Sequence, residues 1–186
     1  RHERLRDDPA RLRAALLQAA RDADIIVSSG GVSAGEADFL PHLLAEIGEV
    51  FFWKVRMRPG MPFLFGRVGR ALMFGLPGNP VSGIATFLNL VKPALDAMCG
   101  AVDPCTPLRA RLRVPIFTRP ARTEFQRARV ECQTHRHLSA SPRQPQGSGK
   151  LRGRAEADAL IVVPESVSEL AAGDVVDFMA LPGWPG

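Results

Sequence analysis

The chain has 186 residues, 46% of them hydrophobic, and a formal net charge of +5. This length allows one or two packed domains, because domains usually run to about 100–150 residues. No stretch reaches the roughly 18 uncharged apolar residues of a membrane helix, and the charged start Arg1-His2-Glu3-Arg4 lacks a signal-peptide core, so we expect a soluble, cytoplasmic protein.

The first part of the sequence alternates helix and strand patterns. Asp8-Pro9 predicts the start of a helix that runs to about Arg21, because a capping carboxylate precedes a proline at the first helical position. Ile25-Ile26-Val27 predicts a short buried strand. A second helix is expected from about Asp38 to Ile47, where Gly48 ends it.

Three strand-like runs and a long helix come next. The strands are expected at 50–53, 62–66 and 71–74, and the amphipathic helix at about 81–98. Pro93 lacks a backbone N–H, so we expect a kink near Asn89. Helices that alternate with buried strands predict an α/β layered domain.

The pattern changes after about Asp103. Residues 108–114 alternate apolar and charged side chains, as a half-buried antiparallel strand does, and short strands are also expected at 125–130, 159–163 and 175–178. We therefore divide the chain into an α/β domain at 1–103 and a small, mostly antiparallel β domain at 104–186.

Charge is distributed unevenly in this second part. Residues 109–154 carry twelve Lys and Arg against two Glu, whereas residues 155–186 carry six acids and no Lys or Arg. We expect these stretches to pair, with Arg109, Arg111 and Arg113 near the acidic tail. A nucleic-acid partner is not expected, because the basic stretch offers only Phe117 and Phe125 for stacking on bases.

The three cysteines, Cys99, Cys105 and Cys132, contain no C-x-x-C pair. This argues against a disulfide framework and a zinc knuckle. Cys132, His135 and His137 are near-adjacent ligands without a fourth partner, and we do not expect them to form a metal site.

The first stretch that predicts chemistry is Ser28 to Asp38, between the buried strand and the second helix. Glycine loops at the carboxyl ends of strands let backbone amides approach phosphate. Ser29 and Ser33 can donate hydroxyl hydrogen bonds, and Glu36 and Asp38 can hold a divalent cation such as Mg²⁺. The alternative is a glycine turn with capping acids and no ligand.

Two further loops follow strands. By strand alternation, Lys54, Arg56 and Arg58 are expected to point to one side and to suit an oxyanion, although an ordinary solvated edge is the alternative. Prolines hold the backbone of the loop at 75–82 in place. Because loops that follow strands of one sheet gather at one edge, we expect the loops at 28–38, 54–60 and 75–82 to surround one cleft.

At these motifs the sequence resembles the molybdopterin molybdotransferases of the MoeA and gephyrin C-terminal type. The matching stretches, in the family's order, are SSGGVSAGEADF (28–39), FWKVRMRPGMPFLFG (52–66), GLPGNPVS (75–82), EFQRARV (124–130), GSGKLRGRAEADALIVVP (147–164) and LAAGDVV (170–176). The resemblance implies a molybdopterin-binding α/β domain, incomplete at its N-terminal side, followed by the family's C-terminal β domain.

The resemblance also implies an activity and a site. Family members insert molybdate into adenylylated molybdopterin, with hydrolysis of the adenylyl phosphate bond assisted by Mg²⁺. Asp38, with Glu36, would serve the metal, and Lys54 and Arg58 would face the anionic ligand. The remaining positions of the pocket would be Ser29, Gly30, Gly31, Ser33, Pro77, Gly78, Asn79, Pro80 and Ser82.

The sequence departs from the family in three ways. Arg58 stands where Lys is frequent, and Met61 stands where a second basic residue is frequent. The two leading domains and the front half of the α/β domain, with its TGDEL-like loop, do not precede Arg1. We therefore interpret the chain as a C-terminal fragment, which is not expected to catalyse alone and would belong to a homodimer when full length.

Two other functions are possible from the sequence. The related molybdopterin adenylyltransferases carry a GGTG-like loop followed by an Arg-Asp pair, whereas this chain has Gly-Gly-Val-Ser and then Glu36-Ala37-Asp38. That loop and the β domain favour the molybdotransferase. A non-enzymatic scaffold or peptide-binding module is the other alternative, but no peptide groove can be identified in the sequence.

Overall fold

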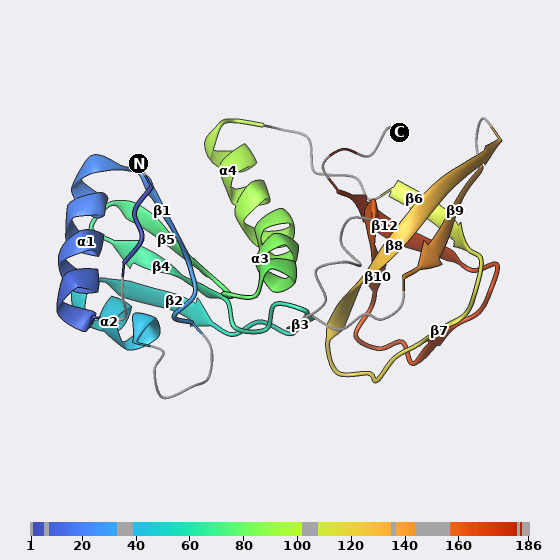
Figure 1. Ribbon diagram of the computed structural model, residues 1–186, viewed down its shortest axis with the longest axis horizontal. Coiled ribbons are helices and arrows are strands. Elements are labelled where there is room, and N and C mark those ends of the chain that lie inside the picture. Colours follow the sequence, from blue (N-terminus) through green and yellow to red (C-terminus); the bar gives the residue numbers. More distant parts are fainter. Residues whose placement is uncertain are drawn as a thin grey trace. The chain divides into compact units, whose positions relative to one another are not determined.

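The computed structural model describes residues 2–5, 8–32, 39–101, 108–134, 137–143, 157–181 and 183. The chain divides into two compact units, which we call the α/β unit (residues 1–55 and 60–91) and the β unit (residues 56–59 and 92–186). The predicted α/β architecture followed by a small β domain is confirmed (Figure 1).

The α/β unit is built on a four-stranded sheet in the order β1-β5-β4-β2. Its strands are β1 (Ile25–Ser29), β2 (Glu49–Trp53), β4 (Leu64–Val68) and β5 (Ala71–Leu76). β1 and β5 are parallel, whereas β4 is antiparallel to both of its neighbours. The predicted strands are thus all present, with small shifts at their ends.

Two helices cover one face of this sheet: α1 (Pro9–Asp22) and α2 (Leu40–Ile47) (Figure 1). Their apolar side chains pack with those of β1, β4 and β5 in one core that includes Leu16, Leu44, Leu64 and Met73. The first helix starts as predicted, since the Asp8 carboxylate accepts hydrogen bonds from the backbone N–H groups of Ala10 and Arg11, at 3.0 and 3.2 Å.

This cap makes a testable contribution to stability. Asp8→Ala leaves the two amides without their acceptor and is expected to lower the free energy of unfolding by about 1 kcal/mol. Asp8→Asn is the matched control, because an asparagine side chain caps a helix equally well. Urea denaturation of the three proteins measures the difference, and equal stability of Asp8→Ala and wild type would contradict a capping role.

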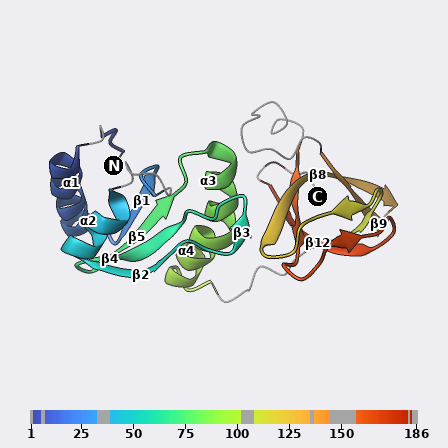
Figure 2. The same cartoon turned by 90° about the horizontal axis from the view of Figure 1, so that it is seen from below.

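The helix predicted at 81–98 is present but changes type along its length. It consists of α3 (Pro80–Thr86), a π-helical turn, η1 (Phe87–Val91), and α4 (Lys92–Met98). The irregularity expected near Asn89 takes the form of this π-helical turn. Pro93 explains it, because a proline cannot donate the i→i−4 hydrogen bond to the Asn89 carbonyl. In the α/β unit, α3 lies on the side of the sheet away from α1 and α2 (Figures 1 and 2).

The β unit contains a small barrel. Its strands are β6 (Leu108–Leu112), β8 (Thr123–Thr134), β9 (His137–Pro142), β10 (Ala159–Val163) and β12 (Val175–Ala180). They pair in the order β10-β12-β6-β9-β8, and β8 pairs back onto β10, which closes the ring. Inward side chains such as Ile161, Val163 and Phe178 fill it.

Three two-residue strands were not predicted. β7 (Ile116–Phe117) pairs with β11 (Glu169–Leu170), and β3 (Met57–Arg58) pairs in parallel with the start of β8. Through β3, residues 56–59 join the β unit although the sequence before and after them belongs to the α/β unit.

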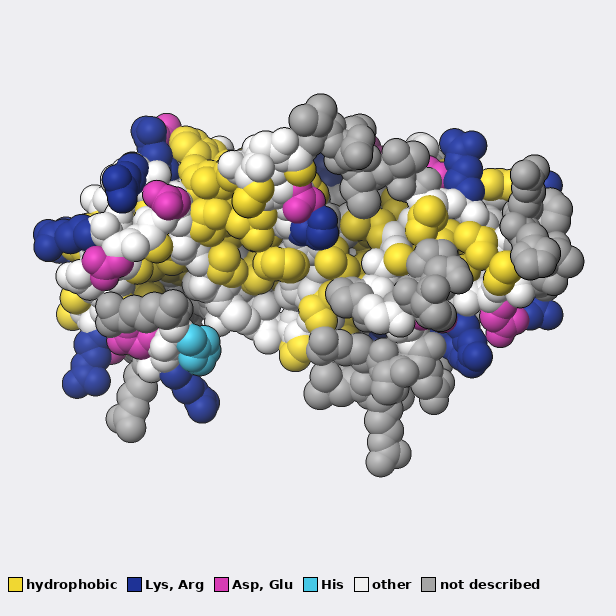
Figure 3. All heavy atoms as spheres, turned by 90° about the horizontal axis from the view of Figure 1, so that it is seen from above, with side chains coloured by type: hydrophobic (Ala, Val, Ile, Leu, Met, Phe, Trp, Pro, Cys, Tyr) yellow, Lys and Arg dark blue, Asp and Glu magenta, His cyan; other side chains and the backbone are white. Residues whose placement is uncertain are grey.

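The predicted pairing with the acidic tail is confirmed for Arg109, whereas Arg113 pairs with Glu131 of the basic stretch itself. Arg109 Nε lies 3.2 Å from Asp177 Oδ1, and Arg113 Nη1 lies 2.8 Å from Glu131 Oε2. Arg111 instead donates to the Gly173 carbonyl at 3.0 Å. On the face shown in Figure 3, Lys and Arg side chains of the described residues lie beside Asp and Glu side chains. In the part of the chain that the structure describes, no helix is long and apolar enough to cross a membrane.

Candidate functional site

The ends of β1 and β5 bring two of the predicted loops together. The two strands are parallel neighbours, with Ser29 opposite Leu76. The loops that follow them therefore leave the sheet at the same edge. The Gly30 N–H donates to the Leu76 carbonyl at 2.9 Å, and a Cβ added at Gly78 would lie 3.5 Å from the Gly30 Cα. The loops that follow β1 and β5 therefore meet here, as the sequence predicted.

Two glycines shape the loop after β1. Gly30 and Gly31 have φ angles of +98° and +73°, which L-residues with a side chain rarely adopt. Val32 then returns to the core, where it is only 1% exposed. Ser29 and Gly31 are exposed, so the turn presents its backbone to solvent at the strand end.

The loop after β5 is held by its own side chains. The Asn79 Oδ1 accepts hydrogen bonds from the N–H groups of Val81 at 3.0 Å and Ser82 at 3.4 Å, which caps α3. Pro80 is the first residue of that helix, Pro77 and Ser82 are buried, and Gly78 is exposed. Asn79 thus fixes the shape of the loop, and its side-chain oxygen is already occupied by these two hydrogen bonds. The backbone around Gly78 is the part of the loop that remains open to a ligand.

The third predicted loop is organised differently from the prediction. β2 ends at Trp53, β3 covers only Met57 and Arg58, and Lys54 has a φ of +71°. The expectation that strand alternation would place Lys54, Arg56 and Arg58 on one side is therefore wrong, because no continuous strand joins them. Lys54 belongs to the α/β unit, whereas the two arginines belong to the β unit.

Both arginines contact β-unit residues. Arg56 donates to the Ala121 carbonyl and its Nε lies 3.3 Å from Glu165 Oε2. Arg58 Nη1 lies 3.2 Å from Glu124 Oε1, and the Glu124 side chain is only 12% exposed. The guanidinium of Arg58 remains largely exposed, so it can still contact an anion on its open side.

Lys54 carries an exposed ammonium group close to the loop after β1. Its Nζ lies 4.3 Å from the centre of the Trp53 ring, and the indole N–H of Trp53 donates to the Val32 carbonyl at 3.0 Å. No carboxylate of the described residues lies within ion-pair distance of this ammonium. The structure thus places the first basic residue of the third loop next to the first loop.

Ser33, Glu36 and Asp38 of the predicted anion and metal site, and His135 of the rejected metal motif, lie outside the described residues.

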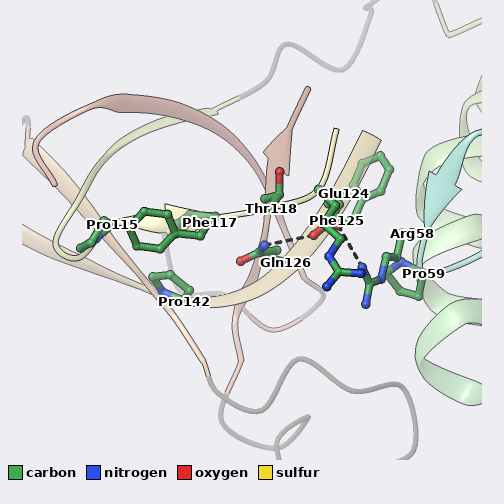
Figure 4. A pocket seen from close by; sticks show the side chains of 11 residues that line it. Arg58, Pro59, Pro115, Phe117, Thr118, Glu124, Phe125, Gln126 and Pro142 are labelled. Atoms are coloured by element: carbon green, nitrogen blue, oxygen red, sulfur yellow. Dashed lines mark hydrogen bonds and ion pairs between the residues drawn. The ribbon is translucent and has the colours of Figure 1, made fainter. Parts of the chain in front are cut away.

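The sequence did not predict a groove that lies in the β unit. It has a volume of about 800 Å³. Pro115, Phe117 and Pro142 lie at one end, and the Glu124–Arg58 pair lies at the other, as Figure 4 shows. Gln126, which is 8% exposed, donates from Nε2 to Glu124 Oε2 at 3.2 Å. Glu124 and Gln126 both belong to the EFQRARV stretch, and Arg58 belongs to the stretch at 52–66, but neither signal predicted a groove.

Comparison with known protein families identifies both halves of the chain. Residues 1–97 match the family described as probable molybdopterin binding domain, and residues 109–181 match the MoeA C-terminal region, domain IV.

The chain belongs to the molybdopterin-binding domain family.

The chain is similar to curated proteins named molybdopterin molybdenumtransferase. The chain is 33% identical to the molybdopterin molybdenumtransferase of Haemophilus influenzae and 38% identical to molybdopterin molybdenumtransferase 2 of Mycobacterium tuberculosis, each over 174 residues. These alignments cover 92% and 90% of this chain but 43% and 42% of the relatives. The chain therefore spans less than half the length of these two relatives.

A solved structure also resembles this chain over nearly its whole length. The molybdopterin biosynthesis MoeA protein from Pyrococcus horikoshii superposes with a TM-score of 0.77 at 31% sequence identity, over 96% of this chain and 42% of that protein. The predicted resemblance to the MoeA type is confirmed.

Proposed function

We propose that this molybdopterin-binding family member acts as a molybdopterin molybdotransferase, which inserts molybdate into adenylylated molybdopterin. The observation that carries the proposal is the meeting of the Gly30 and Gly78 loops at the carboxyl ends of two parallel strands. Ligands of open α/β sheets bind at this edge, where glycine-rich turns let backbone amides approach phosphate.

The chemistry requires that several anionic groups come together. The backbone amides of Gly31 and Gly78 receive the pterin phosphate, with the Ser29 and Ser33 hydroxyl groups as neighbours. Gly30, whose N–H already donates to the Leu76 carbonyl, and the buried Ser82 shape the two loops. The Lys54 ammonium, which has no carboxylate partner among the described residues, attracts molybdate, because opposite charges lower the cost of bringing anions together. Arg58, in the β unit, is a second exposed cation that the resemblance assigns to the anionic ligand.

Mg²⁺ fits the donors that precede the second helix. Glu36 and Asp38 offer carboxylate oxygens, the ligands that Mg²⁺ prefers. When bound there, the ion reduces the repulsion between the phosphate and molybdate. A homodimeric assembly and the lack of a nucleic-acid partner stay predictions.

The β unit distinguishes the two enzymatic alternatives. Its match to the MoeA C-terminal region favours a molybdotransferase over an adenylyltransferase. The names of the relatives in Haemophilus influenzae and Mycobacterium tuberculosis favour the same activity.

The activity can be tested in a chimera that carries this chain in place of the matching region of the Haemophilus influenzae relative. With adenylylated molybdopterin, Mg²⁺ and molybdate, we expect AMP release that depends on molybdate. The parent enzyme is the positive control. A folded chimera that binds adenylylated molybdopterin and releases no AMP when molybdate is added would contradict the proposed function.

Arg58 is expected to affect molybdate affinity in the same assay. Arg58→Ala removes a charge-assisted hydrogen bond, which costs about 1–3 kcal/mol of binding free energy, and should raise the molybdate concentration at half-maximal rate while leaving the saturated rate nearly unchanged. Met61→Lys should lower that concentration by adding a positive charge. Arg56→Ala is the matched control, since Arg56 is an exposed arginine of the same stretch. Normal molybdate dependence in Arg58→Ala would remove Arg58 from the site.

A further inference from the structure

Trp53 contacts two parts of the proposed site at once. Its indole N–H donates to the Val32 carbonyl at 3.0 Å, and the Lys54 Nζ lies 4.3 Å from its ring centre. Val32 is the last described residue before the segment that carries Ser33, Glu36 and Asp38. One side chain therefore joins the loop after β1 to the first basic residue after β2.

The backbone at Lys54 allows this arrangement. Consecutive side chains of a strand point to opposite faces, so an extended Lys54 would point away from the Trp53 ring. Its φ of +71° departs from the strand conformation and accompanies the placement of the ammonium over that ring. The Lys54 N–H donates to the Phe63 carbonyl at 2.8 Å, and the Val55 N–H donates to the Met61 carbonyl at 2.9 Å, so the backbone is held on both sides of the turn.

The Val32 anchor is equally well defined. Val32 is 1% exposed, and a Cβ added at Gly75 would lie 2.6 Å from its Cγ1, so the loop after β1 packs tightly against the end of β5. The Trp53 ring itself packs against the core shared by α1, α2 and the sheet. The indole thus connects a fixed core to both loops.

We propose that Trp53 is a positioning residue of this site, whose ring holds the Lys54 ammonium and whose N–H holds the loop after β1. The inference rests on the proposed function, because Lys54 and that loop are its anion-binding elements. Trp53 itself contacts neither substrate. It acts by reducing the freedom of the groups that do, and pre-ordered groups bind a ligand more tightly.

The experiment uses the full chain and two readouts. Hydrogen exchange of the amides at residues 30–32 reports whether the loop is held, and calorimetric titration with molybdate alone reports whether the site binds an anion. The variants are Trp53→Phe, which keeps a ring and removes the N–H, Trp53→Ala, which removes both, and Lys54→Met. Lys92→Met is the matched control, because Lys92 is a lysine of α4 paired with Asp96.

We expect Trp53→Phe to speed exchange at residues 30–32 roughly fivefold, the effect of one lost hydrogen bond, and to weaken molybdate binding. Trp53→Ala should weaken binding by a further factor of roughly two to five, the range of an exposed cation–π contact. Lys54→Met should weaken binding without changing exchange at residues 30–32, and Lys92→Met should change neither.

The outcomes separate the two claims. Unchanged exchange in Trp53→Phe, or wild-type molybdate affinity in both Trp53 variants while Lys54→Met binds weakly, would overturn the positioning role. The proposed function would be contradicted if Lys54→Met bound molybdate with wild-type affinity, or if the wild type bound no molybdate. In either case, hydrogen exchange at residues 30–32 would still decide whether Trp53 holds the loop. If Trp53→Ala does not fold, Trp53→Phe supplies the test.

Discussion

Phe178→Ala is expected to lower the free energy of unfolding of the β unit by about 3–5 kcal/mol. Phe178 is 0% exposed and lies on β12 between Ile161 of β10 and Leu108 of β6. Truncation to alanine removes the apolar contacts of the ring and leaves a cavity that the closed ring of strands cannot easily collapse to fill.

Phe117→Ala is the matched control, because Phe117 is a phenylalanine of the same unit that is 70% exposed. Its removal should change the stability by less than about 0.5 kcal/mol. Chemical denaturation followed by circular dichroism measures both variants. A loss under 1 kcal/mol for Phe178→Ala would be inconsistent with the barrel core described above.

Asp38→Asn is expected to lower the rate of molybdate insertion by about tenfold or more while molybdopterin binding changes little. An amide keeps the size of the carboxylate but removes the charge that attracts Mg²⁺. Because the ion acts on the reacting groups, its loss should appear in the saturated rate and not in the affinity for the pterin.

The chimera with the Haemophilus influenzae relative provides the assay, and the rate should be measured over a range of Mg²⁺ concentrations. Asp22→Asn is the control, since Asp22 is an aspartate at the end of α1, before the start of β1, whereas the loop follows the other end of that strand. Full turnover of Asp38→Asn would exclude the role assigned to Asp38.

Local sequence patterns predicted most of the fold. Helices α1 and α2, the four strands of the α/β unit and strands β6, β8, β10 and β12 follow from the period of their apolar residues and from caps such as Asp8 and Gly48, whereas β9 was not predicted. The two-residue strands could not be predicted in this way. β3 exists because Met57 and Arg58 pair with Thr123 and Glu124, and no local pattern encodes a pairing between residues so distant in sequence.

The candidate site was predicted in part. The glycine loops after β1 and β5 were placed at one edge because parallel strands end together, and the structure agrees. The orientation of Lys54 was not predictable, because a positive φ at a lysine runs against its intrinsic preference. The Trp53 bond to Val32 joins residues 21 positions apart and depends on tertiary packing.

The central claim is that molybdopterin binds at the edge where β1 and β5 end. The most direct measurement is a nuclear magnetic resonance titration of the chain, labelled with ¹⁵N-glycine, with molybdopterin. Signals of Gly30, Gly31 and Gly78 should shift, whereas those of Gly69, in the turn between β4 and β5 at the opposite edge, and Gly173, in the β unit, should not. Shifts confined to Gly173, or unmoved signals of Gly30, Gly31 and Gly78 at saturating molybdopterin, would contradict the account.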